Sequence, residues 1–281
     1  MRVSLARGLK PLAALPGTLR FQRWLAPHRI ARRTPSAVDY PVVPSETDEN
    51  NPRWCGSPAT FVGWNAHFRG AYEHETLGVL ASLLRPGDSM IEVGGNEGFH
   101  SVFAAWCVGP RGHVFTFEPN PVPRATLAAN IERLGWGDRV TISDSAVADV
   151  SGPRHFFVPG DTAENQGVGG FVDNSRVPTS PILVDATTLD DELADRQCAA
   201  IKLDVQGAEA LVLRGAAQLI RRCKPYVYFE VDDGGAIEAM TFLQDQNYEL
   251  KRVRATRRAP FFEVRPLPGG AWTGNCLAVP R

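Results

Sequence analysis

The stretch MIEVGGNEGFH, residues 90–100, contains the strongest indication of the fold. It opens with mostly apolar residues that end at Val93, as is typical of a buried strand. Gly94, Gly95 and Gly98 follow, and glycines in such a turn let the backbone approach a ligand closely. A helix that starts after the turn directs its free N–H groups at the same ligand. The stretch therefore predicts a strand, a ligand-binding loop and a helix in succession.

The glycine spacing separates two kinds of nucleotide-binding loop. A dinucleotide fingerprint needs G-x-G-x-x-G, but from Gly94 that frame places Asn96 and Phe99 where the later glycines belong. The frame that fits is E-x-G-x-N-x-G, from Glu92 to Gly98. A carboxylate at Glu92 repels a pyrophosphate and attracts a cation. The loop therefore favours a positively charged ligand.

Strands and helices alternate along the rest of the chain. We expect strands over residues 90–93, 113–118, 140–147, 199–205, 226–231, 248–253 and 275–279. We expect helices over residues 72–84, 99–108, 124–134, 208–222 and 236–246, and an irregular segment over 159–181. This alternation predicts an α/β fold with a doubly wound, mostly parallel sheet covered by helices on both faces.

Length and composition limit the class of protein. The chain has 281 residues and a net charge of −1, so we expect one large domain with an appendage and no nucleic-acid partner. It contains no run of 18 apolar residues, so we expect no transmembrane segment. Five isolated cysteines indicate a reducing compartment, and we expect a cytoplasmic protein.

The N-terminal region differs from the rest. Residues 1–38 carry eight Lys and Arg residues and no acid, and residues 39–60 are rich in Pro, Ser, Asn and acids. We therefore expect a basic extension and linker over 1–60 and a folded domain over 61–281. The basic segment could touch an acidic membrane surface, an import receptor or a second subunit, or pack on its own domain.

Acidic and small residues follow the second and third expected strands. Glu118 ends the second strand, where an acid in such a fold can accept both ribose hydroxyls of a nucleoside. Asp144 and Ser145 end the third strand beside the small Ala146, and they could bind an adenine edge. Because Glu92 and Glu118 end neighbouring strands, we expect both on the ligand side.

The fourth expected strand carries two charges on one face. Lys202 and Asp204 alternate with apolar residues in IKLDV, and buried charges need partners. We expect Lys202 to pair with Glu230 on the adjacent strand. Asp204 falls at the strand's carboxyl end, where it could bind a cofactor, bind a substrate or act as a base.

Six segments together resemble the FkbM-type family of S-adenosylmethionine-dependent methyltransferases. They are IEVGGNEGFHS, GHVFTFEPNP, LAANIERLG, TTLDDEL, IKLDVQGAEALVLRGA and KPYVYFEV, and they span about residues 70–235. The resemblance implies a seven-stranded class I sheet with one reversed strand. It also implies S-adenosylmethionine as the cofactor and a small-molecule hydroxyl, of sugar, polyketide or glycolipid type, as the methyl acceptor.

The resemblance also implies roles for single residues. Glu92 is expected near the methionine end of the cofactor, Glu118 on the ribose and Asp204 in the D-x-E-G-x-E motif of the family. The matching loop and base positions are Gly94, Asn96 and Gly98, with Asp144, Ser145 and Ala146 beside the adenine. Three residues depart from the family pattern: Gly95 replaces the usual alanine, Glu97 adds a charge to the loop, and Gln206 replaces a glutamate and cannot take a proton.

Proton transfer from a hydroxyl acceptor benefits from a base, and the candidates are Asp204 and Glu230. Tyr72, Glu73 and His100 are candidate substrate residues, since the resemblance places the first two near the loop and His100 follows it. Asp204, Glu230, Asp232 and Asp233 could surround a metal ion. Two acid-rich strand ends explain them as well, and we expect no metal.

Three other functions fit parts of the sequence. A nicotinamide-dependent oxidoreductase would share the fold but needs the glycine pattern that is missing. A methyltransferase-like module could bind the cofactor without turnover, as Gln206 suggests. A non-enzymatic interaction protein could use the basic segment to dock a partner.

Overall fold

The stretch from Met90 to His100 folds as its sequence predicts. In this computed structural model, β3 (Ser89–Val93) continues into α6 (Phe99–Val108) through the turn at Gly94–Gly98. Gly94 has a φ of 87°, and a Cβ placed there would lie 2.0 Å from the backbone oxygen of Asp204. Only glycine therefore fits at this point of the loop. The structure describes residues 37–42, 51–160, 165–172, 178–231, 234–256, 262–268 and 272–281.

The central sheet confirms the expected α/β class. Within the described residues its strand order is β12-β11-β13-β10-β9-β3-β4-β5. The strands beside β3 are β4 (His113–Phe117), β5 (Val140–Ser143), β9 (Ala200–Leu203) and β10 (Tyr226–Val231), all mutually parallel. Reversed β13 (Gly274–Pro280) separates β10 from β11 (Tyr248–Ala255), and β12 (Phe262–Pro266) adds an antiparallel edge strand that the sequence did not predict.

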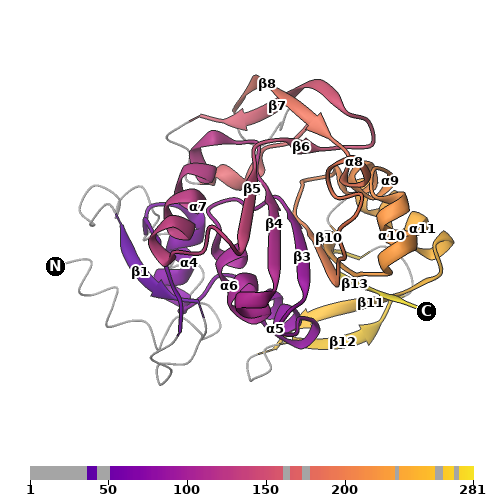
Figure 1. The fold of residues 1–281 in the computed structure, drawn as a ribbon, viewed down its shortest axis with the longest axis horizontal. Coiled ribbons are helices and arrows are strands. Elements are labelled where there is room, and N and C mark those ends of the chain that lie inside the picture. Colours follow the sequence, from indigo (N-terminus) through magenta and orange to yellow (C-terminus); the bar gives the residue numbers. More distant parts are fainter. Residues whose placement is uncertain are drawn as a thin grey trace.

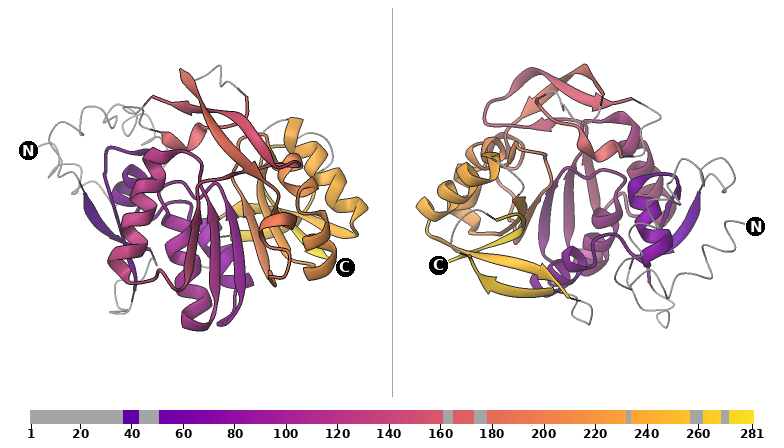
Figure 2. Two further views of the ribbon diagram at one scale, coloured as in Figure 1. Left: turned by 45° about the horizontal axis from the view of Figure 1, so that its top comes forward. Right: turned by 180° about the vertical axis from the view of Figure 1, so that it is seen from behind.

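Helices cover both faces of this sheet, as Figures 1 and 2 show. One layer contains α5 (His74–Leu83), α6 and α7 (Pro121–Leu134), and the other contains α9 (Glu209–Arg214), α10 (Ala217–Cys223) and α11 (Gly234–Asp245). Successive strand residues point to opposite faces, so Met90 packs in the first core and Ile91 in the second. Because these strands are buried on both faces, they appear in the sequence as nearly continuous apolar runs.

Two expected elements are interrupted. The expected strand over 140–147 is wrong: β5 ends at Ser143, and β6 (Ala146–Val147) joins a separate sheet with β7 (Gly152–Pro159) and β8 (Thr179–Thr187). The expected helix over 208–222 is two helices, because Gly215 packs against Ala148, whose backbone oxygen would lie 2.0 Å from an added Cβ. The two interruptions meet in space, because Gly215 between α9 and α10 packs against Ala148, the residue after β6.

The small sheet lies across one end of the central sheet (Figure 2). β7 and β8 form an antiparallel hairpin, and η4 (Gln166–Val168) lies in the connection between them. The prediction of an irregular segment over 159–181 therefore missed the end of β7 and the start of β8. Residues 161–164 and 173–177 of that segment lie outside the described residues.

The prediction of a plain connector over 39–60 is wrong for the residues described there. β1 (Val38–Pro41) and β2 (Arg53–Gly56) form a hairpin beside α4 (Phe61–Arg69), and Trp54 is fully buried in the core around α6. The Trp54 indole donates to the backbone oxygen of Glu97 over 2.7 Å. The hairpin therefore packs against the ligand loop, whereas the division at residue 60 stays a prediction. The basic segment, residues 1–36, lies outside the described residues.

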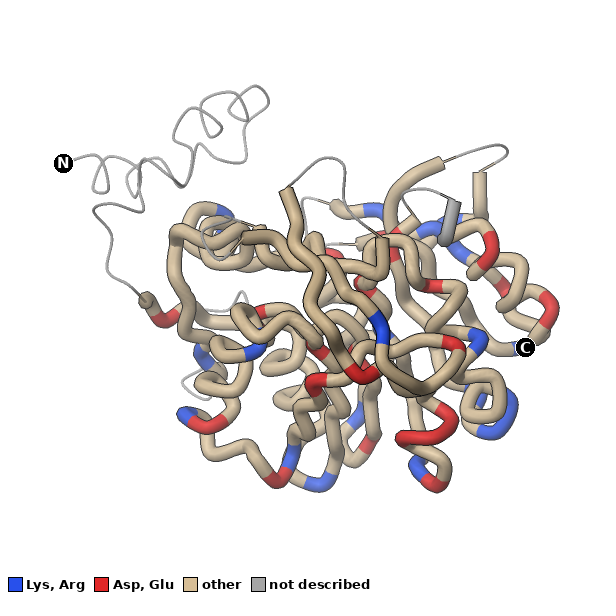
Figure 3. Tube along the Cα trace, turned by 90° about the horizontal axis from the view of Figure 1, so that it is seen from above, with Lys and Arg blue, Asp and Glu red and all other residues tan. Residues whose placement is uncertain are grey.

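Acidic and basic residues are interspersed over the described chain (Figure 3). No helix among the described residues combines the length and the apolar composition that crossing a bilayer requires.

Candidate functional site

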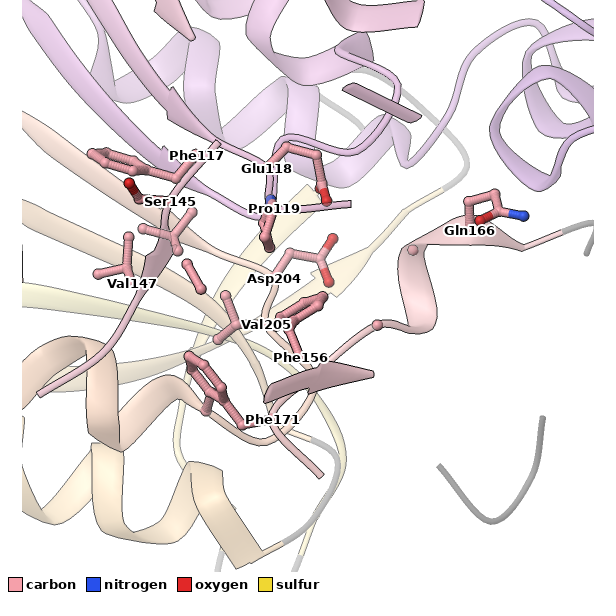
Figure 4. A pocket seen from close by; sticks show the side chains of 16 residues that line it. Phe117, Glu118, Pro119, Ser145, Val147, Phe156, Gln166, Phe171, Asp204 and Val205 are labelled. Atoms are coloured by element: carbon pink, nitrogen blue, oxygen red, sulfur yellow. The ribbon is translucent and has the colours of Figure 1, made fainter. Parts of the chain in front are cut away.

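A pocket opens where the central sheet meets the small sheet. The space within it, counted together with the open solvent at its mouth, is about 490 Å³. Its walls are Val93, Gly94, Phe117, Glu118, Pro119, Ser145, Ala146, Val147, Phe156, Gln166, Gly167, Gly169, Phe171, Asp204, Val205 and Ala208. Figure 4 shows the side chains of Glu118 and Asp204 on this wall together with Phe117, Phe156 and Phe171. The pocket lies at the carboxyl ends of β3, β4 and β9, where open α/β folds bind ligands.

Glu118 is fixed by backbone donors on both carboxylate oxygens. The amide of Asn96 donates to Oε2 and the amide of Asn120 donates to Oε1, each over 2.8 Å. Arg124 Nη1 binds the backbone oxygens of Glu118 and Pro119, which holds the turn after β4. Burial raises the pKa of Glu118 to about 7, and the two amides offset part of that rise. The carboxylate is thus aimed before a ligand arrives.

Backbone amides of the loop after β3 hold this carboxylate and the end of β4 in position. The amides of Gly94 and Gly95 donate to the backbone oxygen of Phe117, which joins the ends of β3 and β4. Asn96 has a φ of 47°, and this conformation turns its amide toward Glu118. Gly98, with a φ of 82°, begins α6 against Leu127. Of the three predicted loop residues, Gly94 lines the pocket. Asn96 and Gly98 do not line it, but they hold Glu118 and the start of α6 in place.

The predicted base-binding residues divide into two groups. Ser145 and Ala146 line the pocket. Asp144 does not: its side chain is 78% exposed and lies 4.0 Å from Arg124. Asp144 follows the last residue of β5 and turns outward, so the prediction that it contacts the ligand is not supported by its position.

Five pocket residues come from β7 and the segment that connects it to β8: Phe156, Gln166, Gly167, Gly169 and Phe171. The sequence indicated that the segment over 159–181 could reach this edge of the sheet, but it singled out none of these residues. Phe156 and Phe171 meet edge to face, with ring centroids 5.7 Å apart. Gln166 is buried and accepts from Asn120 Nδ2 over 3.2 Å, which ties η4 to the turn after β4. Gly167 packs on the Asn96 side chain too closely for a Cβ. The aromatic residues flanking a glycine-rich segment were the available signal.

Glu92 lies inside the sheet and not on the pocket wall. It is fully buried, its Oε1 lies 3.3 Å from Lys202 Nζ, and its Oε2 accepts from the Ser101 hydroxyl of α6. Burial raises the pKa of Glu92, although Lys202 and Ser101 stabilise its charge. The predicted pairing of Lys202 with Glu230 is wrong, since Lys202 is paired with Glu92 on the opposite neighbouring strand.

Asp204 connects this buried pair to the pocket. Its Oδ2 lies 3.5 Å from Lys202 Nζ, and its Oδ1 accepts from Gln206 Nε2 over 3.3 Å. Its side chain is 26% exposed, and it lines the pocket. Glu230 is exposed on β10 and stands opposite Asn275 of β13. The two predicted catalytic acids therefore differ, because only Asp204 reaches the pocket.

The three predicted substrate residues lie together. The Tyr72 ring stacks on His100 with centroids 5.2 Å apart, and Glu73 Oε2 lies 3.7 Å from His100 Nε2. The Thr76 hydroxyl donates to Glu73 Oε2 and contacts the Tyr228 hydroxyl, each over 3.0 Å. Burial and the charge of nearby Asp204 raise the pKa of Glu73 to about 7. The cluster is thus electrostatically linked to the acid on the pocket wall.

Glu97, which the resemblance marked as a departure, lies away from the pocket. Its Oε2 accepts from the Thr60 hydroxyl over 3.1 Å, and the side chain is buried between the N-terminal hairpin and α7. Burial raises its pKa to about 7.

The described residues contain no group of three or more His, Cys, Asp or Glu side chains placed to hold a metal ion. Asp232 and Asp233, two members of the acid cluster considered from the sequence, lie outside the described residues.

Comparisons with known proteins identify the family of the chain. The family model described as the methyltransferase FkbM domain matches residues 92–250, more than half of the chain. A similar curated protein is the 31-O-demethyl-FK506 methyltransferase FkbM of Streptomyces tacrolimicus, 32% identical over 160 residues, or 47% of this chain and 60% of that protein. The protein-L-isoaspartate O-methyltransferase of Hyperthermus butylicus is 38% identical over 66 residues, or 21% of this chain and 27% of that protein.

A solved structure with a similar fold is the methyltransferase FkbM from Methylobacillus flagellatus KT. It is 18% identical, covers 76% of this chain and 52% of that chain, and superposes with a TM-score of 0.49. The chain spans between about a quarter and three fifths of the length of the curated relatives it matches.

Proposed function

Because the chain belongs to the FkbM family of methyltransferases, we propose that it transfers the methyl group of S-adenosylmethionine to a hydroxyl oxygen of a small molecule. S-adenosylmethionine is the cofactor of this family. The observation that carries the proposal is Glu118, whose two oxygens are preset by the amides of Asn96 and Asn120 on the wall of the pocket. A nucleoside ribose presents two hydroxyl donors to such a carboxylate.

The pocket residues fit the adenosine part of this cofactor. Glu118 would hold the ribose, and Ser145 and Ala146 would border the adenine. Phe156 and Phe171 offer aromatic surface to the base from the β7–β8 connection. Gly94 leaves space beside Asp204 that any side chain would fill. Each of these contacts uses a residue already held in place by the fold.

When bound, S-adenosylmethionine supplies a methyl group that its sulfonium has already activated. The chain's own task is then to position the acceptor oxygen and take its proton, and positioning alone can contribute about 7–11 kcal/mol. We assign proton acceptance to Asp204, which lines the pocket. Glu230 stays a second candidate at the end of the neighbouring strand.

Binding measurements test the cofactor assignment. Isothermal titration of the full chain with S-adenosylmethionine, NAD and FAD should show binding of the first alone. Binding of NAD without S-adenosylmethionine would instead support the nicotinamide oxidoreductase.

A second function, cofactor binding without turnover, is favoured by one contact. Gln206 stands where related chains have a glutamate and donates to Asp204 Oδ1, which occupies an oxygen of the proposed base. Transfer of labelled methyl from S-adenosylmethionine to sugars, polyketides and glycolipids distinguishes the two. Labelled product identifies an enzyme, and binding without any product supports the module.

A further inference from the structure

Two hydrogen-bond acceptors converge beside the pocket with no donor between them. Glu73 Oε2 lies 3.7 Å from His100 Nε2, and this buried nitrogen has no hydrogen-bond partner among the described residues. The ring donates from its other nitrogen to the backbone oxygen of Tyr72, and burial holds its pKa well below the usual value. The neutral ring therefore presents a lone pair at Nε2. Glu73 Oε2 already accepts from the Thr76 hydroxyl, whereas His100 Nε2 remains unsatisfied until a donor enters.

The backbone of Glu73 supports this arrangement. Glu73 has a φ of 47° and a ψ of 68°, and its side chain makes no capping bond to α5, although it stands at the N-cap position. A residue with a Cβ seldom adopts this left-handed conformation. Such outliers often mark binding positions, because the surrounding structure must hold them. Here the conformation places the carboxylate within reach of both His100 and the Thr76 hydroxyl in the first turn of α5.

Charged and titratable groups surround Glu73 on several elements. Lys202 and Asp204 of β9 act on its charge, and Tyr72 and Thr76 hydrogen-bond to it. Among the described residues, the groups that face this cluster are Tyr72, Glu75, Thr76, His100, Lys202, Asp204, Tyr228 and Glu230. Lys202 is the single cation of the set, and it already pairs with Glu92 and Asp204. The space between Glu73 and His100 therefore suits a positive ligand.

We propose that Glu73 and His100 bind the α-ammonium group of the cofactor's methionine part. This inference rests on the proposed function. A primary ammonium carries three N–H donors and a positive charge, so one group satisfies both acceptors. A hydroxyl of the methyl acceptor has one proton and no charge, and it would satisfy only one of them. His100 follows Phe99 at the start of α6, directly after the loop whose Gly94 lines the pocket.

Three ligands separate this role from a structural one. S-adenosylmethionine and S-adenosylhomocysteine both carry the ammonium, whereas methylthioadenosine keeps the adenine and ribose and lacks the amino acid part. In isothermal titrations, E73Q should weaken the first two roughly 10- to 100-fold, as expected for a charged hydrogen bond. Methylthioadenosine should bind E73Q and the unchanged chain within about twofold. E132Q, which makes the same change of charge on the exposed face of α7, is the matched control and should alter none of the three affinities.

The unchanged chain offers a second readout. Its affinity for S-adenosylhomocysteine, divided by that for methylthioadenosine, should rise about tenfold between pH 6 and pH 8, because the Glu73 carboxyl must lose its proton to pair with the ammonium. Glu118, whose pKa is also raised to about 7, acts on the ribose of both ligands and cancels in this ratio. The rise should disappear in E73Q.

Two results would overturn the inference while leaving the proposed function intact. One is an equal loss of all three ligands in E73Q, which indicates a structural role. The other is unchanged affinity for all three, with an affinity ratio that does not vary with pH. If the unchanged chain bound none of these ligands, the proposed function would fail and this inference with it.

Discussion

Glu92 and Glu118 look alike in the sequence, where both are expected to end neighbouring strands, yet the fold uses them in opposite ways. Glu92 lies within β3, opposite Thr116 on one side and Lys202 on the other, and its charge is compensated inside the protein. Glu118 lies one residue beyond β4 and is compensated by two loop amides while facing the pocket. A carboxylate inside the ladder supports the sheet, and one just past its end is available to a ligand.

The largest effect should come from replacing Lys202, the cation of β9 that lies beside Glu92 of β3. In K202M, Glu92 and Asp204 lose their shared ammonium, and breaking a buried pair from one side costs about 3–5 kcal/mol. We expect the free energy of unfolding in urea at pH 7 to fall by that amount. The double variant E92Q/K202M should recover part of the loss, because no buried carboxylate is then left unpaired at this position. A loss below about 1 kcal/mol in K202M would contradict the assigned role.

The second change should lower the affinity for the ligand and leave the stability of the fold unaltered. In E118Q, the amide group can accept from only one of the two backbone donors and loses the charge that the ribose hydroxyls would bind. We expect the affinity for S-adenosylmethionine in isothermal titration to fall roughly 10- to 100-fold. D144N, on the exposed side chain that turns away from the pocket, is the control and should leave the affinity unchanged. An E118Q chain that binds normally would remove Glu118 from the site.

The same two acids show what sequence reasoning could reach. The turn at Gly94 and the acid at Glu118 depend on local spacing, because a strand, a tight turn and a helix are encoded by adjacent residues. The partner of Lys202 depends on lateral pairing. β9 lies between β3 and β10, so Lys202 has Glu92 beside it on one strand and Tyr228 on the other. The sequence offers Lys202 an acid on each neighbouring strand, Glu92 on β3 and Glu230 on β10, and does not indicate which of them its side chain reaches.

Contacts from distant segments were harder still to predict. Phe156 and Phe171 reach the pocket only because β6 leaves the central sheet and pairs with β8. That exchange depends on Ser143–Ala146, a short break in a run that reads as one continuous strand. The burial of Trp54 could not be predicted, because it lies in a segment whose composition is typical of a linker. One buried indole contributes little to an average over 22 residues. Periodicity predicts elements, and tertiary pairing decides where each one ends.

Glu97 provides the last test, because it is a buried acid in the turn between β3 and α6 that pairs with no cation among the described residues and does not line the pocket of Glu118. Its folded-state pKa is raised to about 7 by burial, above the ordinary value. An acid shifted in this direction contributes stability below its unfolded pKa and loses it as pH rises through the folded pKa, so the window runs from about pH 4.5 to pH 7. E97Q keeps an oxygen for the Thr60 hydroxyl and has no charge to bury. Relative to the unchanged chain, E97Q should therefore gain roughly 3 kcal/mol in unfolding free energy at pH 8, since a change of one unit in pKa is worth about 1.4 kcal/mol, and nothing at pH 4.

Urea unfolding at the two pH values measures this difference directly, and E132Q on the exposed face of α7 is its control, with the same change of charge and no burial. If E97Q were less stable than the unchanged chain at pH 8, the ionised carboxylate would have to be stabilising the loop. Glu97 would then resemble Glu118, an acid whose charge the fold supports, and the contrast between acids that are held for a ligand and acids that are only buried would need a different physical cause.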